Sequence, residues 1–364
     1  MRAIAVIATL LLLLCPGQAP AQQQDDDPLT VYLLTMGSGD LVWEKYGHNA
    51  LWIRDNASGT DRVYNYGVFD FESPGYWGRF IRGDWLYELA VSDIDLTLYQ
   101  YAYLNRTVIA QELALTPQQK SELAEFLEWN ALPQNKEYLY DYFWDNCSTR
   151  LRDVLNMVMG GQLRRDTEGE PTGTTFRWHS RRLMADMPVV YTALNAGLGP
   201  EADQPIDAWE EMFLPEKLYE RIREMQVPGA DGGTQPLVSS ERVLYEAEGR
   251  SPDRATPPAW IPGYLVIGGL LAALLAGLAS ATRQGSRAAR VGFGVLASAW
   301  ALLIGIGGLL LVGLWAFTSH TAAHRNENLL QFDPLAIALV LLIPAALLGA
   351  RWARRPAYLL ALAV

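Results

Sequence analysis

The chain is organised around the sequence Tyr140-Asp141-Tyr142-Phe143-Trp144-Asp145-Asn146-Cys147-Ser148-Thr149-Arg150, which carries one of its two cysteines. Asp145 and Asn146 belong to the residue types favoured at a helix N-cap, and apolar residues follow at helical spacing. We therefore expect Cys147 to open a helix, where the dipole and the unpaired N–H groups of the first turn favour the thiolate. A cysteine in this setting is either a nucleophile or a small buried residue.

The other cysteine, Cys15, lies in an N-terminal segment typical of exported proteins. Arg2 precedes an apolar run that ends near the small-residue sequence Ala19-Pro20-Ala21, which predicts a signal peptide over residues 1–21. An uncleaved signal anchor is the alternative, although its apolar core is short for a membrane span. After cleavage, Cys147 is an unpaired thiol in an oxidising compartment, so we expect it to have a function.

The acidic balance of the chain, with a formal net charge of -11, argues against a nucleic-acid-binding protein. Residues 29–163 are expected to form a periplasmic domain that mixes helices with an antiparallel sheet. Strands are predicted at 29–36, 46–54, 62–67, 85–91 and 106–115, helices at 96–104 and from 117, and an aromatic loop at 74–77.

The remaining chain falls into three parts by composition. Residues 164–248 have weak signals and are expected to be an accessory helical region, and the proline-rich residues 249–259 a linker. Residues 260–364 form a predicted transmembrane region, with apolar segments at 260–282, 291–317 and 334–352 and the possible start of a fourth at 357. Arginines follow the first and third segments, which places the Cys147 domain and the 319–333 loop on the outer face.

A thiol becomes a catalyst when an imidazole takes its proton and a third group orients the imidazole. His48, on a predicted strand beside a glycine, is the candidate base for Cys147, although a single strand histidine is more often structural. Asn65, on the partner strand of the predicted hairpin, is the candidate third member. The register of the turn leaves Tyr64 or Asp70 as alternatives.

Candidate substrate-binding residues are Arg106, Arg150, Tyr64 and Asn326. A guanidinium can donate hydrogen bonds to two oxygens of one phosphate or carboxylate group. The alternative for both arginines is an ion pair within the domain. Asn326 would bind a lipid head group if the outer loop packs over the Cys147 cleft. His320 and His324 in this loop have a spacing compatible with zinc, but a solvated loop is expected, and we predict no metal or cofactor.

Three motifs together resemble the Lnb N-terminal periplasmic domain family. They are Trp43-Glu44-Lys45-Tyr46-Gly47-His48-Asn49-Ala50, Val63-Tyr64-Asn65-Tyr66-Gly67-Val68-Phe69-Asp70-Phe71 and residues 140–153. The outer loop and the multi-span tail are similar to that family too, so the resemblance runs from about residue 29 to the end of the chain. It implies an α+β, permuted papain-like (NlpC/P60-type) domain with a Cys147 nucleophile and a His48 base.

The resemblance also implies an activity, acylation of bacterial lipoproteins at the inner membrane. An acyl chain would pass from a phospholipid or a lipoprotein diacylglyceryl group, through a Cys147 thioester, to the N-terminal amine of a lipoprotein. The residues alone leave two alternatives open. One is a cell-wall peptidase or amidase of NlpC/P60 type, and the other is a non-catalytic periplasmic binding or sensor module on a membrane anchor.

Overall fold

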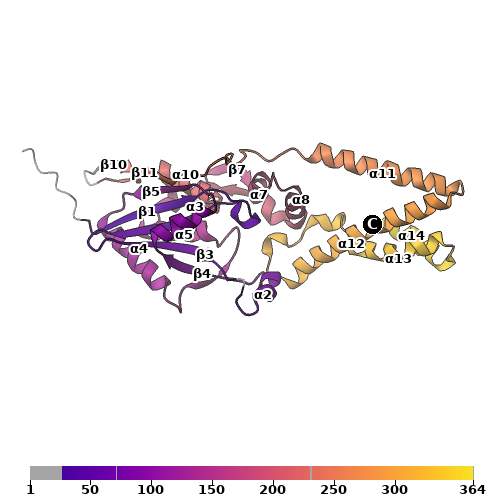
Figure 1. Cartoon of the computed structure of the whole chain (residues 1–364), viewed down its shortest axis with the longest axis horizontal. Coiled ribbons are helices and arrows are strands. Elements are labelled where there is room, and N and C mark those ends of the chain that lie inside the picture. The colour runs from indigo at the N-terminus through magenta and orange to yellow at the C-terminus, as the bar shows by residue number, and fades with distance from the viewer. Residues whose placement is uncertain (1–26, 71, 230–231, 364) are drawn as a thin grey trace, which may run out of the picture.

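The computed structural model describes residues 27–70, 72–229 and 232–363. The predicted signal peptide at residues 1–21 lies outside the described residues. The molecule is elongated, with a part that mixes helices and strands at one end and a bundle of apolar helices at the other (Figure 1).

A seven-stranded sheet forms the centre of the first part, and each pair of neighbouring strands is antiparallel. The strand order is β11-β5-β1-β2-β3-β4-β6. The strands are β1 (Leu29–Met36), β2 (His48–Asp55), β3 (Thr60–Val68), β4 (Trp85–Ser92), β5 (Val108–Leu113), β6 (Glu137–Tyr140) and β11 (Val238–Tyr245). The predicted α+β class with an antiparallel sheet is confirmed.

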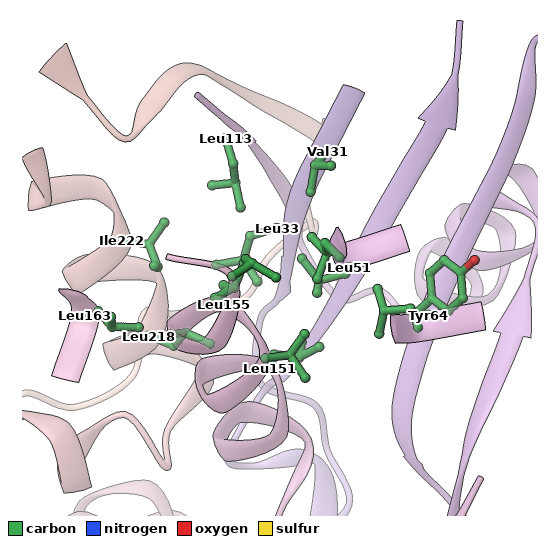
Figure 2. Packing of buried hydrophobic residues seen from close by; sticks show 14 of the residues in the cluster. Val31, Leu33, Leu51, Tyr64, Leu113, Leu151, Leu155, Leu163, Leu218 and Ile222 are labelled. Atoms are coloured by element: carbon green, nitrogen blue, oxygen red, sulfur yellow. The ribbon is translucent and has the colours of Figure 1, made fainter. Parts of the chain in front are cut away.

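Both faces of the sheet are covered by helices because the strands alternate two sets of apolar side chains. One face packs on α4 (Pro117–Asn130), α5 (Cys147–Val158) and α10 (Pro215–Glu224), and the other on α3 (Ile94–Tyr103). Figure 2 shows Leu151 and Leu155 of α5 against Leu33 and Leu51 of the sheet. These four side chains are fully buried, and each such leucine contributes about 1.5–3 kcal/mol of transfer free energy.

The aromatic segment predicted as a loop at 74–77 begins a short helix, α2 (Tyr76–Arg82). Gly75 and Gly83 flank it with φ of 75° and 82°, a conformation in which a side chain is strained. The two glycines therefore fix both ends of α2.

The region at 164–248, predicted to be helical, also supplies strands. It holds α6 (Gln162–Thr167), β7 (Pro171–Thr175), α7 (Phe176–Leu183), α8 (Pro188–Gly197), η2 (Pro200–Asp203), β8 (Pro205–Asp207), α9 (Ala208–Glu211), α10, β9 (Gln226–Pro228), β10 (Thr234–Pro236) and β11. Because β11 pairs with β5, the chain returns here to the central sheet.

The predicted linker at 249–259 lies against the first domain. The Arg250 guanidinium donates two hydrogen bonds of 2.9 Å to the Asp40 carboxylate. Asp253 accepts a hydrogen bond of 2.5 Å from the Ser38 hydroxyl. These contacts hold the proline-rich segment to the domain just before the membrane region begins.

Two helices of the described chain are long and apolar enough to cross a membrane, α11 (Ile261–Arg283) and α12 (Arg287–Phe317). The third predicted segment, 334–352, holds η5 (Pro334–Ala338) and α13 (Leu339–Leu347), which together with residues 321–330 make a third candidate span bent by 60°. The predicted fourth start at 357 lies in α14 (Arg351–Ala363). Glycines in α12 allow η5 to approach closely, since a Cβ on Gly305 would lie 2.6 Å from the Ile337 nitrogen. Gly349, whose φ is 99°, lies in the turn between α13 and α14.

The outer loop, predicted to be solvated, is packed against the periplasmic domain. It holds η3 (Thr321–Ala323) and η4 (Glu327–Leu330). The Ser319 N–H donates to the Arg82 carbonyl at 2.6 Å, and the Gly199 N–H donates to the Ala322 carbonyl at 2.7 Å. Ala322 itself is buried among apolar side chains of the domain.

Candidate active site

The candidate site lies where strands β2 and β3 diverge. Their ladder runs from Asp55↔Thr60 to Leu51↔Tyr64, and His48 and Asn65 lie beyond its last pair. Strand alternation places these two side chains on the face that packs on α3. Cys147 comes from the opposite face, at the start of α5.

Gly67 is the position where the two faces meet. A Cβ built there would lie 3.5 Å from the Cys147 Cβ, 3.8 Å from the Tyr140 ring and 3.9 Å from the His48 ring. Its φ of 89° and the register shift between Tyr66 and Val68 turn the strand locally. The missing side chain leaves the space in which the thiol and the imidazole come together.

The side chains of His48 and Cys147 are hydrogen-bonded to each other. His48 Nε2 lies 2.5 Å from the Asn65 Oδ1. Because an amide oxygen only accepts, Nε2 is the donor, and Nδ1 is left to exchange a proton with the sulfur. The Tyr101 ring stacks on the imidazole, with centroids 6.5 Å apart and an angle of 18° between the planes.

The start of α5 is held by its cap. The Asn146 Oδ1 accepts hydrogen bonds from the Ser148 and Thr149 N–H groups at 2.8 and 3.0 Å. The Asn146 Nδ2 donates to the Tyr142 and Phe213 carbonyls at 3.0 and 2.9 Å. The cap therefore fixes the first turn and ties it to a segment far along the chain.

Cys147 is 8% exposed, and burial by itself raises the pKa of its thiol. The charge of His48, the hydrogen bond from His48 and the backbone N–H groups of Asn49 and Ser148 outweigh burial and lower this pKa below its ordinary value. The site thus favours a thiolate.

The opposite shift occurs at His48. Burial lowers the pKa of the imidazole, but the charge of Cys147 and hydrogen bonds to Cys147 and Asn65 outweigh it, so the pKa is raised. Arg106 acts against this rise through its own positive charge. A lowered thiol pKa beside a raised imidazole pKa moves the proton of the pair toward the imidazole.

We expect iodoacetamide to alkylate Cys147 at pH 6 much faster than it alkylates free cysteine. A thiol with a pKa of about 8.5 is only about 0.3% thiolate at that pH. Since the pKa of Cys147 is lowered, its rate should fall only as the pH drops through this lower value. Mass spectrometry of the labelled peptide measures the rate. A pH profile that matches free cysteine would contradict the thiolate.

Arg106 is the one predicted substrate-binding arginine near the dyad, and it is 5% exposed. Its Nε donates to the Gly37 carbonyl at 2.8 Å, and the guanidinium lies 5.0 Å from the Tyr101 ring centroid. The Arg106 Nη1 lies 3.9 Å from the Glu44 Oε1, and the Arg106 Nη2 has no hydrogen-bond partner among the described residues. Arg106 therefore supports the ring that stacks on His48.

The other three predicted substrate-binding residues contact protein groups away from the thiol. Arg150 pairs with Asp145 and covers the Tyr138 ring at 4.1 Å, so the ion-pair alternative is the one observed. The Tyr64 hydroxyl donates to Glu128 of α4, on the face opposite Asn65. Asn326 is 3% exposed, and its Nδ2 donates to the Ala196 and Gly197 carbonyls, each at 2.8 Å.

Asn326→Ala is therefore expected to loosen the outer loop. The substitution removes the donor of the Gly197 carbonyl and one of the two donors of the Ala196 carbonyl, the other being Asn328, and an unpaired buried carbonyl costs about 1–3 kcal/mol. Thermal unfolding of the full chain in detergent should show a lower midpoint. Glu327→Ala, at the exposed neighbouring position, is the matched control. Equal midpoints for the two variants would contradict the role of Asn326 in holding the loop.

The two histidines of the outer loop have separate partners. His320 packs edge-on against the Trp85 ring, with centroids 5.6 Å apart, and His324 Nε2 bonds the Thr318 carbonyl at 3.0 Å. In the described part of the chain, no group of three or more His, Cys, Asp or Glu side chains is placed to hold a metal. A cavity of about 380 Å³ lies beside His324 and Trp144, apart from the Cys147 dyad.

Several site residues were not predicted from the sequence. Tyr101 reaches His48 from α3, and the Asn49 N–H points at the sulfur from the residue after His48. Of these residues, Gly67 was the easiest to find from the sequence, because a glycine inside a strand often marks a place where another group approaches the backbone closely. Tyr101 had no comparable signal, since an aromatic on a helix is usually a core residue.

Comparison with known families gives two matches. Residues 18–182 match the Lnb N-terminal periplasmic domain, and residues 266–361 match the Lnb transmembrane domain. The chain is thus a membrane protein with a periplasmic N-terminal domain. Searches of curated proteins and of solved structures return no match.

Proposed function

Because the chain belongs to the family that joins an Lnb N-terminal periplasmic domain to an Lnb transmembrane domain, we propose that it is a cysteine-dependent acyltransferase of the bacterial inner membrane. The acceptor is the N-terminal amine of a lipoprotein. The observation that carries this proposal is the hydrogen-bonded set of Cys147, His48 and Asn65.

The arrangement supports a permuted papain-like domain. A thiol at a helix start, an imidazole on a strand and an amide that orients the imidazole are the three parts of a cysteine-enzyme triad. Here the imidazole precedes the thiol in the chain, by 147 − 48 = 99 positions. Asn65 fixes the ring through Nε2, so Nδ1 serves Cys147.

The first chemical step forms a thioester. The Cys147 thiolate attacks an ester carbonyl of a phospholipid or a lipoprotein diacylglyceryl group, the C–O bond breaks, and the leaving alkoxide takes the proton of the His48 imidazolium. The Ser148 and Thr149 N–H groups are bound by the cap, so the Cys147 N–H is the first-turn donor proposed to stabilise the oxyanion.

The second step transfers the acyl chain. The lipoprotein amine attacks the thioester, an amide bond forms, His48 accepts the amine proton and the Cys147 thiolate leaves. The membrane region keeps the site at the lipid surface. This matters because drawing an acyl chain out of the bilayer costs about 0.8 kcal/mol per CH₂.

The test uses the full chain in phospholipid vesicles with a diacylated lipoprotein peptide. Isotope-labelled acyl chains in the phospholipid distinguish the two donors. We expect mass spectrometry to show an amide-linked acyl chain on the peptide. Cleavage of a cell-wall peptide without acyl transfer would overturn the proposal in favour of a peptidase.

Asn65→Ala is expected to lower the rate of acyl transfer by about 10- to 100-fold, the usual loss when a group that orients an active-site side chain is removed. The pH profile of Cys147 alkylation should also shift upward, because the imidazolium loses a partner. Tyr64→Phe is the matched control, since the Tyr64 hydroxyl bonds Glu128 on the opposite face. If Tyr64→Phe were the more damaging variant, the assignment of Asn65 would fail.

A further inference from the structure

An apolar helix face lies at the boundary between the periplasmic domain and the membrane helices. In α2, Trp77, Phe80 and Ile81 lie three and four residues apart, so they share one face. Their side chains are 62%, 38% and 66% exposed. An exposed set of this kind marks an interaction surface.

Two hydrogen bonds connect the domain near this surface to the ends of the membrane helices. The Arg82 carbonyl at the end of α2 accepts from the Ser319 N–H, two residues after α12 ends. On another side, the Thr192 hydroxyl of α8 bonds the Tyr264 hydroxyl near the start of α11 at 2.7 Å. Since α11 begins and α12 ends at the outer membrane surface, α2 and α8 both lie at that surface (Figure 1).

Stacked rings connect α2 with the thiol. The Phe80 and Trp85 rings stack at 5.1 Å, and Trp85 stacks on Tyr140 at 6.0 Å. The Tyr140 ring then borders the space at Gly67 that Cys147 also borders. These contacts form an unbroken row of aromatic side chains from α2 to the space beside Cys147.

We propose that α2 is an interfacial helix that inserts Trp77 and Ile81 into the outer leaflet and admits lipid acyl chains along the Phe80–Trp85–Tyr140 path. The occupant is the bilayer, because the surface is continuous with the ends of two membrane helices. Tryptophan is favoured at such an interface. The acyl path rests on the proposed function, whereas insertion of α2 does not.

Fluorescence quenching tests the insertion in the full chain. Cys15→Ala and Cys147→Ala remove the native thiols, Ile81→Cys is labelled with bimane, and the protein is placed in vesicles containing lipids with a nitroxide near the top of the acyl chain. Val243→Cys is the control, 57% exposed on β11 at the far edge of the sheet. We expect at least about twofold stronger quenching at position 81, since interfacial helices reach about 5–10 Å into the bilayer. Equal quenching at both positions would overturn the insertion.

Ile81→Glu, in the chain with its native cysteines, tests the path. Acyl transfer from vesicle lipids should fall about tenfold, because a charge opposes entry into the bilayer. Alkylation of Cys147 should stay unchanged, which shows that the dyad is intact. Unchanged transfer would overturn the path. Loss of activity in the parent chain as well would instead count against the proposed function, and the quenching result would still decide the insertion.

Discussion

Cys147→Ala is expected to abolish acyl transfer while the protein remains folded. In the proposed mechanism the Cys147 thiolate carries the acyl chain, and removing the nucleophile of a catalytic triad lowers the rate by about 10³-fold or more. Stability should change by only about 1 kcal/mol, because the side chain is small and α5 stays anchored by its cap and its leucines. Mass spectrometry of the peptide product measures transfer, and circular dichroism checks the fold.

Cys147→Ser separates the loss of the thiol from the loss of side-chain volume. It keeps the size of the side chain, but the serine hydroxyl has a far higher pKa than the thiol, so this variant should also be inactive. Met157→Ala on the same helix, 48% exposed, controls for general damage to α5. Transfer at the parent rate in either Cys147 variant would rule out the thioester.

His48→Gln is expected to lower acyl transfer by about 10²- to 10⁴-fold, the usual contribution of a general acid–base group. Glutamine can still hydrogen-bond Asn65, but it cannot shuttle the proton between Cys147 and the substrate. The pKa of the Cys147 thiol should also rise, because the charge and hydrogen bond of His48 lower it in the parent chain. The rate of acyl transfer and the rate of Cys147 alkylation at pH 6 should therefore both fall in this variant.

His48→Ala supplies a positive test of the same role. It opens a space next to Cys147 that added imidazole can enter, so imidazole in the buffer should restore part of the transfer. Imidazole should do nothing for Cys147→Ala, in which the nucleophile itself is missing. Parent-level transfer in His48→Gln would show that another group takes the thiol proton.

The periplasmic domain is in direct contact with the membrane region at two places. The outer loop contacts the domain through Ser319 and Ala322, and α8 contacts α11 through Thr192. These contacts join the domain that carries Cys147 to the membrane helices. The proposed acyl transfer requires such a connection, because its lipid substrate stays at the bilayer surface.

Much of the local structure was predictable. Asn146 at the N-cap, the glycine and proline turn signals and the alternating strands specify elements through interactions of neighbouring residues. The apolar segments covered by α11 and α12 were predictable from length and composition. The helical residues 334–347 lie inside the third predicted segment, but the bend of 60° between them and residues 321–330 was not predictable, because it depends on how η5 packs on the glycines of α12.

The candidate site was likewise only partly predictable from the sequence. The sequence by itself determined that Cys147 opens a helix and that His48 begins a strand, since both follow from local preferences of the chain. Only the tertiary structure decided that Asn65, not Tyr64, orients His48, and that Arg150 pairs with Asp145. These outcomes depend on which face of the sheet each side chain occupies and on the gap at Gly67, and both are set by strand register and helix packing between distant residues.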